Sequence, residues 1–205
     1  MKATSFLTIL DAGEGIYKEK GSKFMAFAYR VKNETEIDEK IKALQKKYFD
    51  ARHHCYAWIL GVDQERFRVF DDGEPHHSAG DPILGQIKSR NLSHVLVVVV
   101  RYFGGVKLGV GGLMVAYREA ASEALKAAQI VTERVRVAFT WRLPFLSLSE
   151  GMGILKEVGA NIGIQKYGED CELNFLVEAA KVEAFLNRVE RLNLNNPIDM
   201  GTEIF

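Results

Sequence analysis

The chain has 205 residues, of which 47% are hydrophobic, and its 27 basic side chains balance its 27 acidic ones. This composition is typical of a globular protein, and the zero net charge argues against binding to polyanions through overall charge. No apolar run approaches the ~20 residues of a membrane span, so we expect no membrane association.

The amino-terminal segment and the cysteines indicate the compartment. The first residues are weakly apolar, but Asp11 and Glu14 interrupt them and no cleavage-type region follows, so we expect no signal peptide. Cys55 and Cys171 lie far apart in the sequence. Two isolated cysteines predict reduced thiols in a cytoplasmic protein rather than a disulfide scaffold.

Hydrophobic periodicity predicts the elements of the first part of the chain. The alternation in this segment predicts a strand with Phe24, Ala26 and Ala28 on one face and the larger Met25, Phe27 and Tyr29 on the other. Asp81 fits a helix N-cap, and Pro82 fits the first helical position. In order, the predicted elements are a strand over 22–31, a helix over 35–48, strands over 54–60 and 66–70, a loop over 71–75, a short helix from Asp81, a strand over 95–102 and a helix over 113–128.

The second part of the chain has a simpler pattern. It predicts a strand over 134–142, a helix capped by Ser147 or Ser149 and ended by Gly159, strands over 161–166 and 171–177, a helix over 181–192 and a strand over 198–205. The inward residues of the second helix are predicted to be Val182, Phe185, Leu186, Val189 and Leu192. This order of elements is typical of a ferredoxin-like domain. We therefore place the two domains at 1–132 and 133–205, joined by a short, stiff connection.

The segment 95–117 joins an apolar strand to a helix through paired glycines. Gly104-Gly105 and Gly111-Gly112 flank Lys107 and Gly109. The spacing matches neither of the common nucleotide-binding glycine motifs. Two interpretations remain open. The amides of 109–112, with Lys107, hold a phosphate or carboxylate, or the glycines serve positive φ angles and close packing.

Three carboxylates follow the second predicted hairpin. Asp71, Asp72 and Glu74 offer the oxygen ligands that Mg²⁺ prefers, and Arg101 and Lys107 would then make phosphate chemistry conceivable. The alternative is a solvated turn, in which Asp side chains cap neighbouring amides. Aspartate and glycine are such common turn formers that the residues favour the turn.

A zinc site or a cysteine nucleophile is also conceivable. His53-His54-Cys55 and His76-His77 supply zinc-type ligands. Adjacent histidines in a strand point to opposite faces, however, and the spacing fits no closed zinc pattern. A nucleophilic Cys55 would have a nearby histidine but no third, orienting group. We therefore predict no metal, no cofactor and no catalytic residue.

Basic residues with interleaved aromatics suit single-stranded nucleic acid or structured RNA. Tyr102, Phe103 and Tyr117 supply the aromatics; the alternative is that these rings belong to the core. The candidate residues for binding an anion or nucleic acid are Lys23, Arg52, Arg101, Lys107, Gly109, Gly111, Gly112 and Arg118.

Together these stretches resemble the signature of the Impact/YigZ family. The resemblance is carried by Asp71-Asp72-Gly73-Glu74-Pro75, Ser78-Ala79-Gly80, Arg101-Tyr102-Phe103-Gly104-Gly105 and Ala116-Tyr117, with Ser22-Lys23-Phe24 and Arg52-His53-His54-Cys55 upstream. The chain departs from the family in three places. Ser78 stands where members usually have Thr, and His76-His77 where residues are commonly small or polar. Val115 stands where a basic residue often precedes Ala-Tyr, so a contact of that base with an anionic partner would be missing here.

The resemblance implies an α+β fold with two domains. The N-terminal domain would be like the second domain of ribosomal protein S-five, a fold shared with GHMP-type kinases. The ferredoxin-like domain would be like the last domain of elongation factor G. Both analogies point toward RNA or the ribosome.

The family also sets the functional expectation. Eukaryotic Impact proteins resemble translational regulators that compete for the activator of the kinase acting on initiation factor two, a pathway that bacteria lack. We expect a non-enzymatic cytoplasmic binding protein, associated with RNA or the ribosome and linked to the regulation of translation. One alternative is a phosphate- or nucleotide-binding enzyme that uses the glycine loop with Asp71, Asp72 and Glu74. The other is a protein-interaction module with a translation-related partner.

Overall fold

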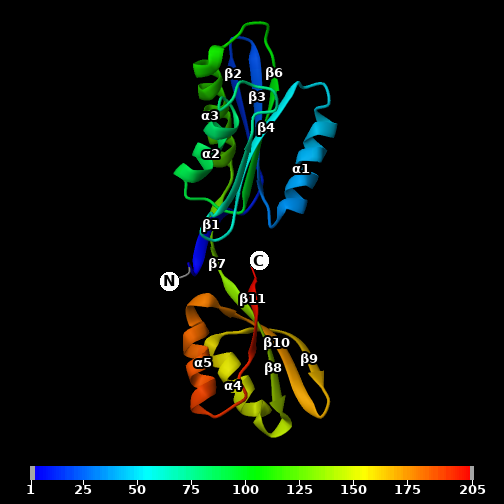
Figure 1. Ribbon diagram of the computed structural model, residues 1–205, viewed down its shortest axis with the longest axis vertical. Coiled ribbons are helices and arrows are strands. Elements are labelled where there is room, and N and C mark those ends of the chain that lie inside the picture. The colour runs from blue at the N-terminus through cyan, green and yellow to red at the C-terminus, as the bar shows by residue number, and fades with distance from the viewer. Residues whose placement is uncertain (1–2, 204–205) are drawn as a thin grey trace. The chain divides into compact units, whose positions relative to one another are not determined.

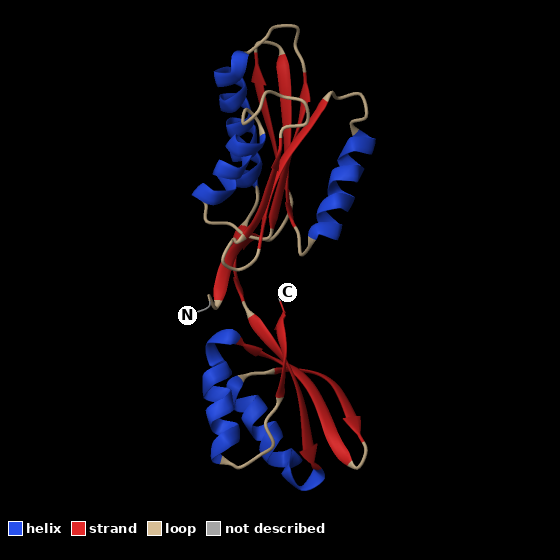
Figure 2. Ribbon diagram, viewed as in Figure 1, coloured by secondary structure: helices blue, strands red, loops and turns tan. Residues whose placement is uncertain are grey.

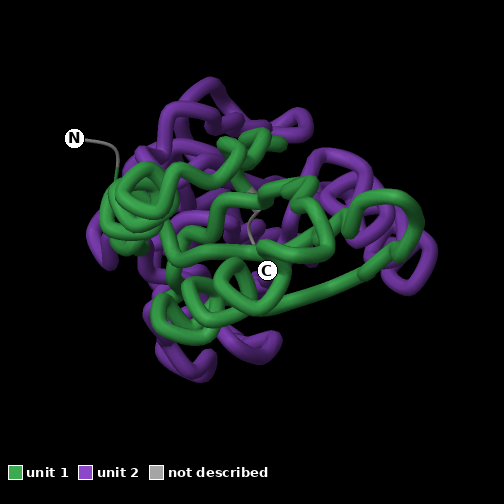
Figure 3. Tube along the Cα trace, turned by 90° about the horizontal axis from the view of Figure 1, so that it is seen from below, with its two compact units in different colours: residues 1–5, 133–205 green, residues 6–132 purple. Residues whose placement is uncertain are grey.

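The computed structural model describes residues 3–203 and divides into two compact units (Figure 3). One unit is Phe6–Thr132, and the other groups Glu133–Phe205 with Met1–Ser5. The sequence assigned residues 1–5 to the first domain instead. Of the described residues in this segment, Thr4 contacts the second unit, since its carbonyl accepts a hydrogen bond from the amide of Val135 at 2.9 Å.

The unit Phe6–Thr132 is built on a five-stranded sheet in the order β2-β3-β6-β4-β5, in which all neighbours are antiparallel. A separate pair, β1 with β7, joins the start of this unit to its end. The elements are β1 (Ser5–Ile9), β2 (Gly13–Glu19), β3 (Ser22–Arg30), α1 (Glu34–Lys47), β4 (His53–Leu60), β5 (Arg66–Phe70), α2 (Gly80–Ser89), β6 (Val95–Tyr102), α3 (Gly109–Ala127) and β7 (Ile130–Arg134).

Helices cover both faces of this sheet, with α1 on one side and α2 and α3 on the other (Figures 1 and 2). The alternation predicted for β3 is confirmed, because Phe24, Ala26 and Ala28 pack in the core under α2 and α3. Met25 and Phe27 pack in the opposite core under α1. The central strand β6 is buried on both faces, which explains its unbroken run of apolar residues.

The structure differs from the predictions at three places in this unit. Strands β1, β2 and β7 were not predicted. Helix α3 begins at Gly109, not at Leu113, so three of the candidate glycines lie in its first turn. The N-cap of α2 is Ala79, and Asp81 lies in the first turn instead. Glycine is a poor helix former, which is why the start of α3 was not recognisable from propensity.

The second unit has the ferredoxin-like order of elements, with an antiparallel sheet in the order β11-β8-β10-β9. Its elements are β8 (Arg136–Pro144), α4 (Leu148–Val158), β9 (Asn161–Tyr167), β10 (Asp170–Glu178), α5 (Val182–Arg191) and β11 (Ile198–Glu203). Trp141, Phe175 and Phe185 form the centre of its core. The chain is therefore an α+β protein. The last two residues of the predicted final strand lie outside the described residues.

Two details of this second unit correct the predictions. Leu186 and Leu192, expected to point inward from α5, are 39% and 41% exposed. Ser147 occupies the N-cap of α4, but its side chain makes no capping hydrogen bond. Gly159 does end α4 in the left-handed conformation, as predicted. No helix among residues 3–203 is long and apolar enough to cross a membrane.

Candidate functional site

Asp71 caps the start of α2 although it lies eight or nine residues earlier in the sequence than the amides it binds there. One carboxylate oxygen accepts hydrogen bonds from the amides of Ala79 at 3.0 Å and Gly80 at 2.8 Å, and the other accepts from the amide of His77 at 2.9 Å. Burial raises the pKa of Asp71, but these three hydrogen bonds outweigh it and hold the pKa below its usual value. Asp71 therefore satisfies helix-start amides, which is the role that the sequence suggested for Asp81.

Asp72 fastens the turn to β4. Its carboxylate accepts from the amide of His54 at 2.7 Å, and its carbonyl lies 2.8 Å from Nδ1 of His53. A carbonyl only accepts hydrogen bonds, so Nδ1 of His53 is the donor in this contact. The other ring nitrogen, Nε2, lies 4.0 Å from Oε1 of Glu74. Both Asp72 and Gly73 have positive φ angles, as a tight turn requires.

Glu74 is the buried centre of the site, with a side chain only 4% exposed. Its Oε1 accepts from Nη1 of Arg101 at 2.5 Å and from the hydroxyl of Tyr117 at 2.7 Å. Arg101 is itself only 7% exposed. Burial raises the pKa of Tyr117 far above its usual value, so the hydroxyl stays protonated as a donor.

Each of the three carboxylates thus binds its own separate set of protein donors, and the three do not converge on one point. Among the described residues, no group of three or more His, Cys, Asp or Glu side chains is placed to hold a metal ion. The Mg²⁺ interpretation of Asp71, Asp72 and Glu74 has no geometric support, and the zinc interpretation of the histidines has none either.

Cys55 does not have the features of a nucleophile. Its thiol is fully buried and lies 3.0 Å from the carbonyl of Asp71 and 3.3 Å from the hydroxyl of Tyr117. Burial raises the pKa of the Cys55 thiol far above its usual value, so almost no thiolate forms at neutral pH. This cysteine packs the site from beneath.

A pocket of about 440 Å³ opens above the Glu74–Arg101 pair. The guanidinium of Arg101 lies between two aromatic rings, 5.3 Å from the centre of Phe24 and 5.6 Å from that of Phe103. The residues lining the pocket are Arg52, His53, Glu74, Pro75, Arg101, Phe103, Lys107, Leu108, Gly109, Val110 and Leu113.

The charges of this pocket are not balanced. Arg52 and Lys107 are both exposed, and neither has an acidic partner among residues 3–203. The helix start adds to this excess, because the N-cap Leu108 gives no side-chain hydrogen bond and the first turn of α3 contains no acidic residue. A helix start with open amides and nearby cations attracts anions.

The fold requires some of the glycines near the pocket but not others. A Cβ on Gly104 would lie 1.9 Å from the backbone of Gly21, so close packing requires that glycine. Gly105 and Gly109 have positive φ angles, at +87° and +71°. Gly111 is different, because it has no positive φ and a Cβ there would meet nothing within 4 Å. Folding therefore does not require a glycine at 111.

The pocket contains only part of the predicted set of binding residues. Arg52, Arg101, Lys107 and Gly109 line it, whereas Lys23, Gly111 and Gly112 do not. Arg118 lies in a separate hollow between α2 and α3. The sequence missed Leu108, Val110 and Leu113, which only the helix start at Gly109 brings into the pocket.

The remaining motif residues support the site from outside the pocket. The hydroxyl of Ser78 is buried and donates to the carbonyl of Pro75 at 2.6 Å, a bond that a threonine would also make. Tyr102 donates to Asp50 at 2.7 Å. Val115 lies on α3 but does not line the pocket, so the lack of a base there leaves the pocket's own cations unchanged.

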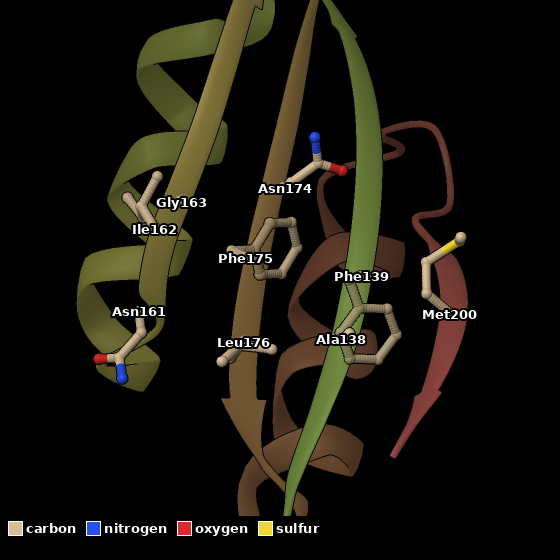
Figure 4. A pocket seen from close by; sticks show the side chains of 9 residues that line it. All are labelled: Ala138, Phe139, Asn161, Ile162, Gly163, Asn174, Phe175, Leu176 and Met200. Atoms are coloured by element: carbon tan, nitrogen blue, oxygen red, sulfur yellow. The ribbon is translucent and has the colours of Figure 1, made fainter. Parts of the chain in front are cut away.

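A second pocket, also of about 440 Å³, lies in the other unit (Figure 4). Its lining residues come from β8, β9, β10 and β11 and include Ala138, Asn174, Leu176 and Met200. None of them is charged. The first pocket is therefore the better candidate for an anionic partner.

Comparisons with known proteins match the part of the chain that holds this first pocket. The family model of the Impact N-terminal domain matches residues 20–125. The chain is 34% identical over 188 residues to the IMPACT family member YvyE of Bacillus subtilis, covering 88% of this chain and 83% of that protein. It is 34% identical over 149 residues to the IMPACT family member YigZ of Escherichia coli, covering 71% and 72% of the two chains.

A solved structure extends the likeness to both units. It is described as "Crystal structure of an hypothetical protein" and superimposes with a TM-score of 0.74 at 26% sequence identity. The match covers 98% of this chain and 99% of the other. The arrangement of elements is therefore shared along the whole chain.

Proposed function

The chain belongs to the Impact family, and on this premise we propose that it is a non-enzymatic binding protein that holds RNA at the start of α3. The observation that carries the proposal is the charge excess of the pocket, where Arg52 and Lys107 stand beside open helix-start amides without acidic partners among the described residues. Phosphates are the anions that such a surface favours.

The aromatic wall of the pocket supports RNA rather than a small inorganic anion. Phe103 is 46% exposed and lies over the guanidinium of Arg101. Single-stranded nucleic acids bind where a cationic groove meets exposed aromatic rings, because bases stack on the rings while phosphates contact the cations. Val110, 51% exposed, extends this apolar wall along α3.

The cellular setting is part of the same proposal. Both cysteines are free thiols, which suits the reducing cytoplasm. A role near translation, through RNA, the ribosome or a translation-related protein, follows from the family resemblance. The magnesium-dependent enzyme loses support because the carboxylates it needs already bind protein donors.

We expect Arg52→Gln and Lys107→Gln each to weaken binding of a single-stranded RNA about fivefold to tenfold at low salt, because each removes one phosphate contact. Each substitution should also reduce the slope of log affinity against log salt by about 0.7, the value for one contact on a single strand. Fluorescence anisotropy of a labelled oligonucleotide across a salt series measures both quantities.

Lys42→Gln is the matched control, because Lys42 is exposed on α1, which covers the other face of the sheet. It should change neither the affinity nor the slope. Absence of RNA binding at low salt, or pocket variants that behave like the control, would reject the proposed function.

A further inference from the structure

We infer that the pocket at the start of α3 recognises a phosphomonoester, the terminal phosphate of an RNA chain or of a mononucleotide, in preference to an internal phosphodiester. The inference rests on the proposed function and makes it more specific. Four features of the pocket support it: its net charge, the unpartnered Nε of a buried arginine, the number of its donors and its size.

The charge of the pocket matches a dianion. Its lining contains three cationic side chains, Arg52, Arg101 and Lys107, against the single carboxylate of Glu74, which leaves a formal charge of +2. The start of α3 adds about half a positive charge. An internal phosphodiester carries a charge of −1, whereas a phosphomonoester carries about −1.5 to −2 at neutral pH.

Arg101 is held in a way that leaves its buried Nε without a hydrogen-bond partner among the described residues. Glu74 binds only Nη1, and Nε is buried with no hydrogen-bond partner in the described part of the chain. The side chain is only 7% exposed, so its position is fixed by packing between Phe24 and Phe103. The Nε and Nη2 edge of an arginine is suited to bind two oxygens of one phosphate.

The number of donors also favours a terminal phosphate. The pocket combines the Arg101 edge, the exposed cations Arg52 and Lys107, and the first amides of α3. A terminal phosphate presents three oxygens to such separate groups of donors, and an internal phosphate presents only two. An unpartnered buried donor costs free energy, so a ligand oxygen that reaches Nε adds to affinity.

The volume and walls fit the end of a chain. About 440 Å³ is within the range of small-molecule sites and suits a group the size of one nucleotide. Phe103, Val110 and Leu113 provide an apolar wall for the base beside the cationic part.

The test compares oligoribonucleotides of one sequence that differ only at their ends. Anisotropy competition would use the 5′-phosphorylated, the 3′-phosphorylated and the unphosphorylated oligomer, together with uridine 5′-monophosphate. We expect one phosphorylated oligomer to bind about tenfold more tightly than the unphosphorylated one. Lys107→Gln should reduce this ratio to near one, and Lys42→Gln should retain it.

The outcomes separate this inference from the proposed function. Equal binding of all three oligomers overturns the inference and leaves the proposed RNA binding standing. Uridine 5′-monophosphate that binds as tightly as the better oligomer supports the phosphomonoester but overturns RNA as its source. If no oligomer and no mononucleotide binds, both are overturned.

Discussion

Glu74→Ala should destabilise the unit Phe6–Thr132 by about 3–5 kcal/mol, the usual cost of removing one partner from a buried ion pair. The substitution leaves the charge of Arg101, 7% exposed, without its carboxylate. It also removes the acceptor of the fully buried Tyr117 hydroxyl. The cost comes from these stranded groups more than from the lost attraction itself.

Urea denaturation measures this effect through Trp58, which is buried in the same unit. The other tryptophan, Trp141, lies in the second unit, so wild type and variant are best compared in a Trp141→Phe background. Glu39→Ala, at an exposed position of α1, is the control and should stay within about 0.5 kcal/mol of wild type. A loss below about 1 kcal/mol for Glu74→Ala would contradict the buried pair described here.

Replacing both charged residues tests whether the unpaired charge of Arg101 causes the loss of stability. The double variant Glu74→Leu, Arg101→Leu should recover much of the stability that Glu74→Ala loses, because an apolar pair leaves no unpaired buried charge. It should nevertheless bind RNA poorly, since the arginine of the pocket is gone.

Gly104→Ala should cost about 3 kcal/mol, as an added Cβ forces two backbone segments apart. That Cβ would lie 1.9 Å from the carbonyl carbon of Gly21 and 2.2 Å from the nitrogen of Ser22. Because both neighbours are backbone atoms, no side-chain rotation relieves the overlap. The hydrogen bond from the Gly104 amide to Ser22 Oγ, at 3.1 Å, should be lost as well. The same urea titration measures this loss.

Gly111→Ala is the matched comparison for Gly104→Ala. It lies in the first turn of α3, and a Cβ there meets nothing within 4 Å. Alanine is a better helix former, so stability should stay the same or rise by up to about 1 kcal/mol. If the ligand approaches this backbone, RNA binding should weaken while stability rises. A Gly104→Ala variant as stable as Gly111→Ala would show that the close contact with Gly21 is absent in solution.

Periodicity predicted much of the fold because burial imposes it. The alternation in β3 and the helical spacing of Ile37, Ile41 and Leu44 in α1 each identify a buried face. The second unit was predicted more completely, since its strands and helices alternate with clear turns. Strands β1, β2 and β7 were missed, although β2 alternates between buried and exposed positions.

The site was harder to predict, because its roles depend on contacts distant in sequence. Asp71 contacts amides six to nine residues away, and nothing local distinguishes it from an ordinary turn residue. The role of Glu74 is visible only in the folded protein, where β6 and α3 bring Arg101 and Tyr117 beside it. Lys23 was selected for its charge and its place in the motif Ser22-Lys23-Phe24, and neither reveals whether a cation lines the pocket.

We propose that RNA contacts the start of α3, and the most direct test follows the backbone amides during a titration with single-stranded RNA. In ¹⁵N-correlated spectra of the full chain, the largest shifts should occur at Lys107, Gly109, Val110 and Gly111, which begin α3 or directly precede it. Such a result would place the ligand where the helix amides and the unbalanced cations meet. If these amide signals stay unchanged and the shifts occur elsewhere, such as around Leu176 in the second unit, RNA does not bind at the start of α3.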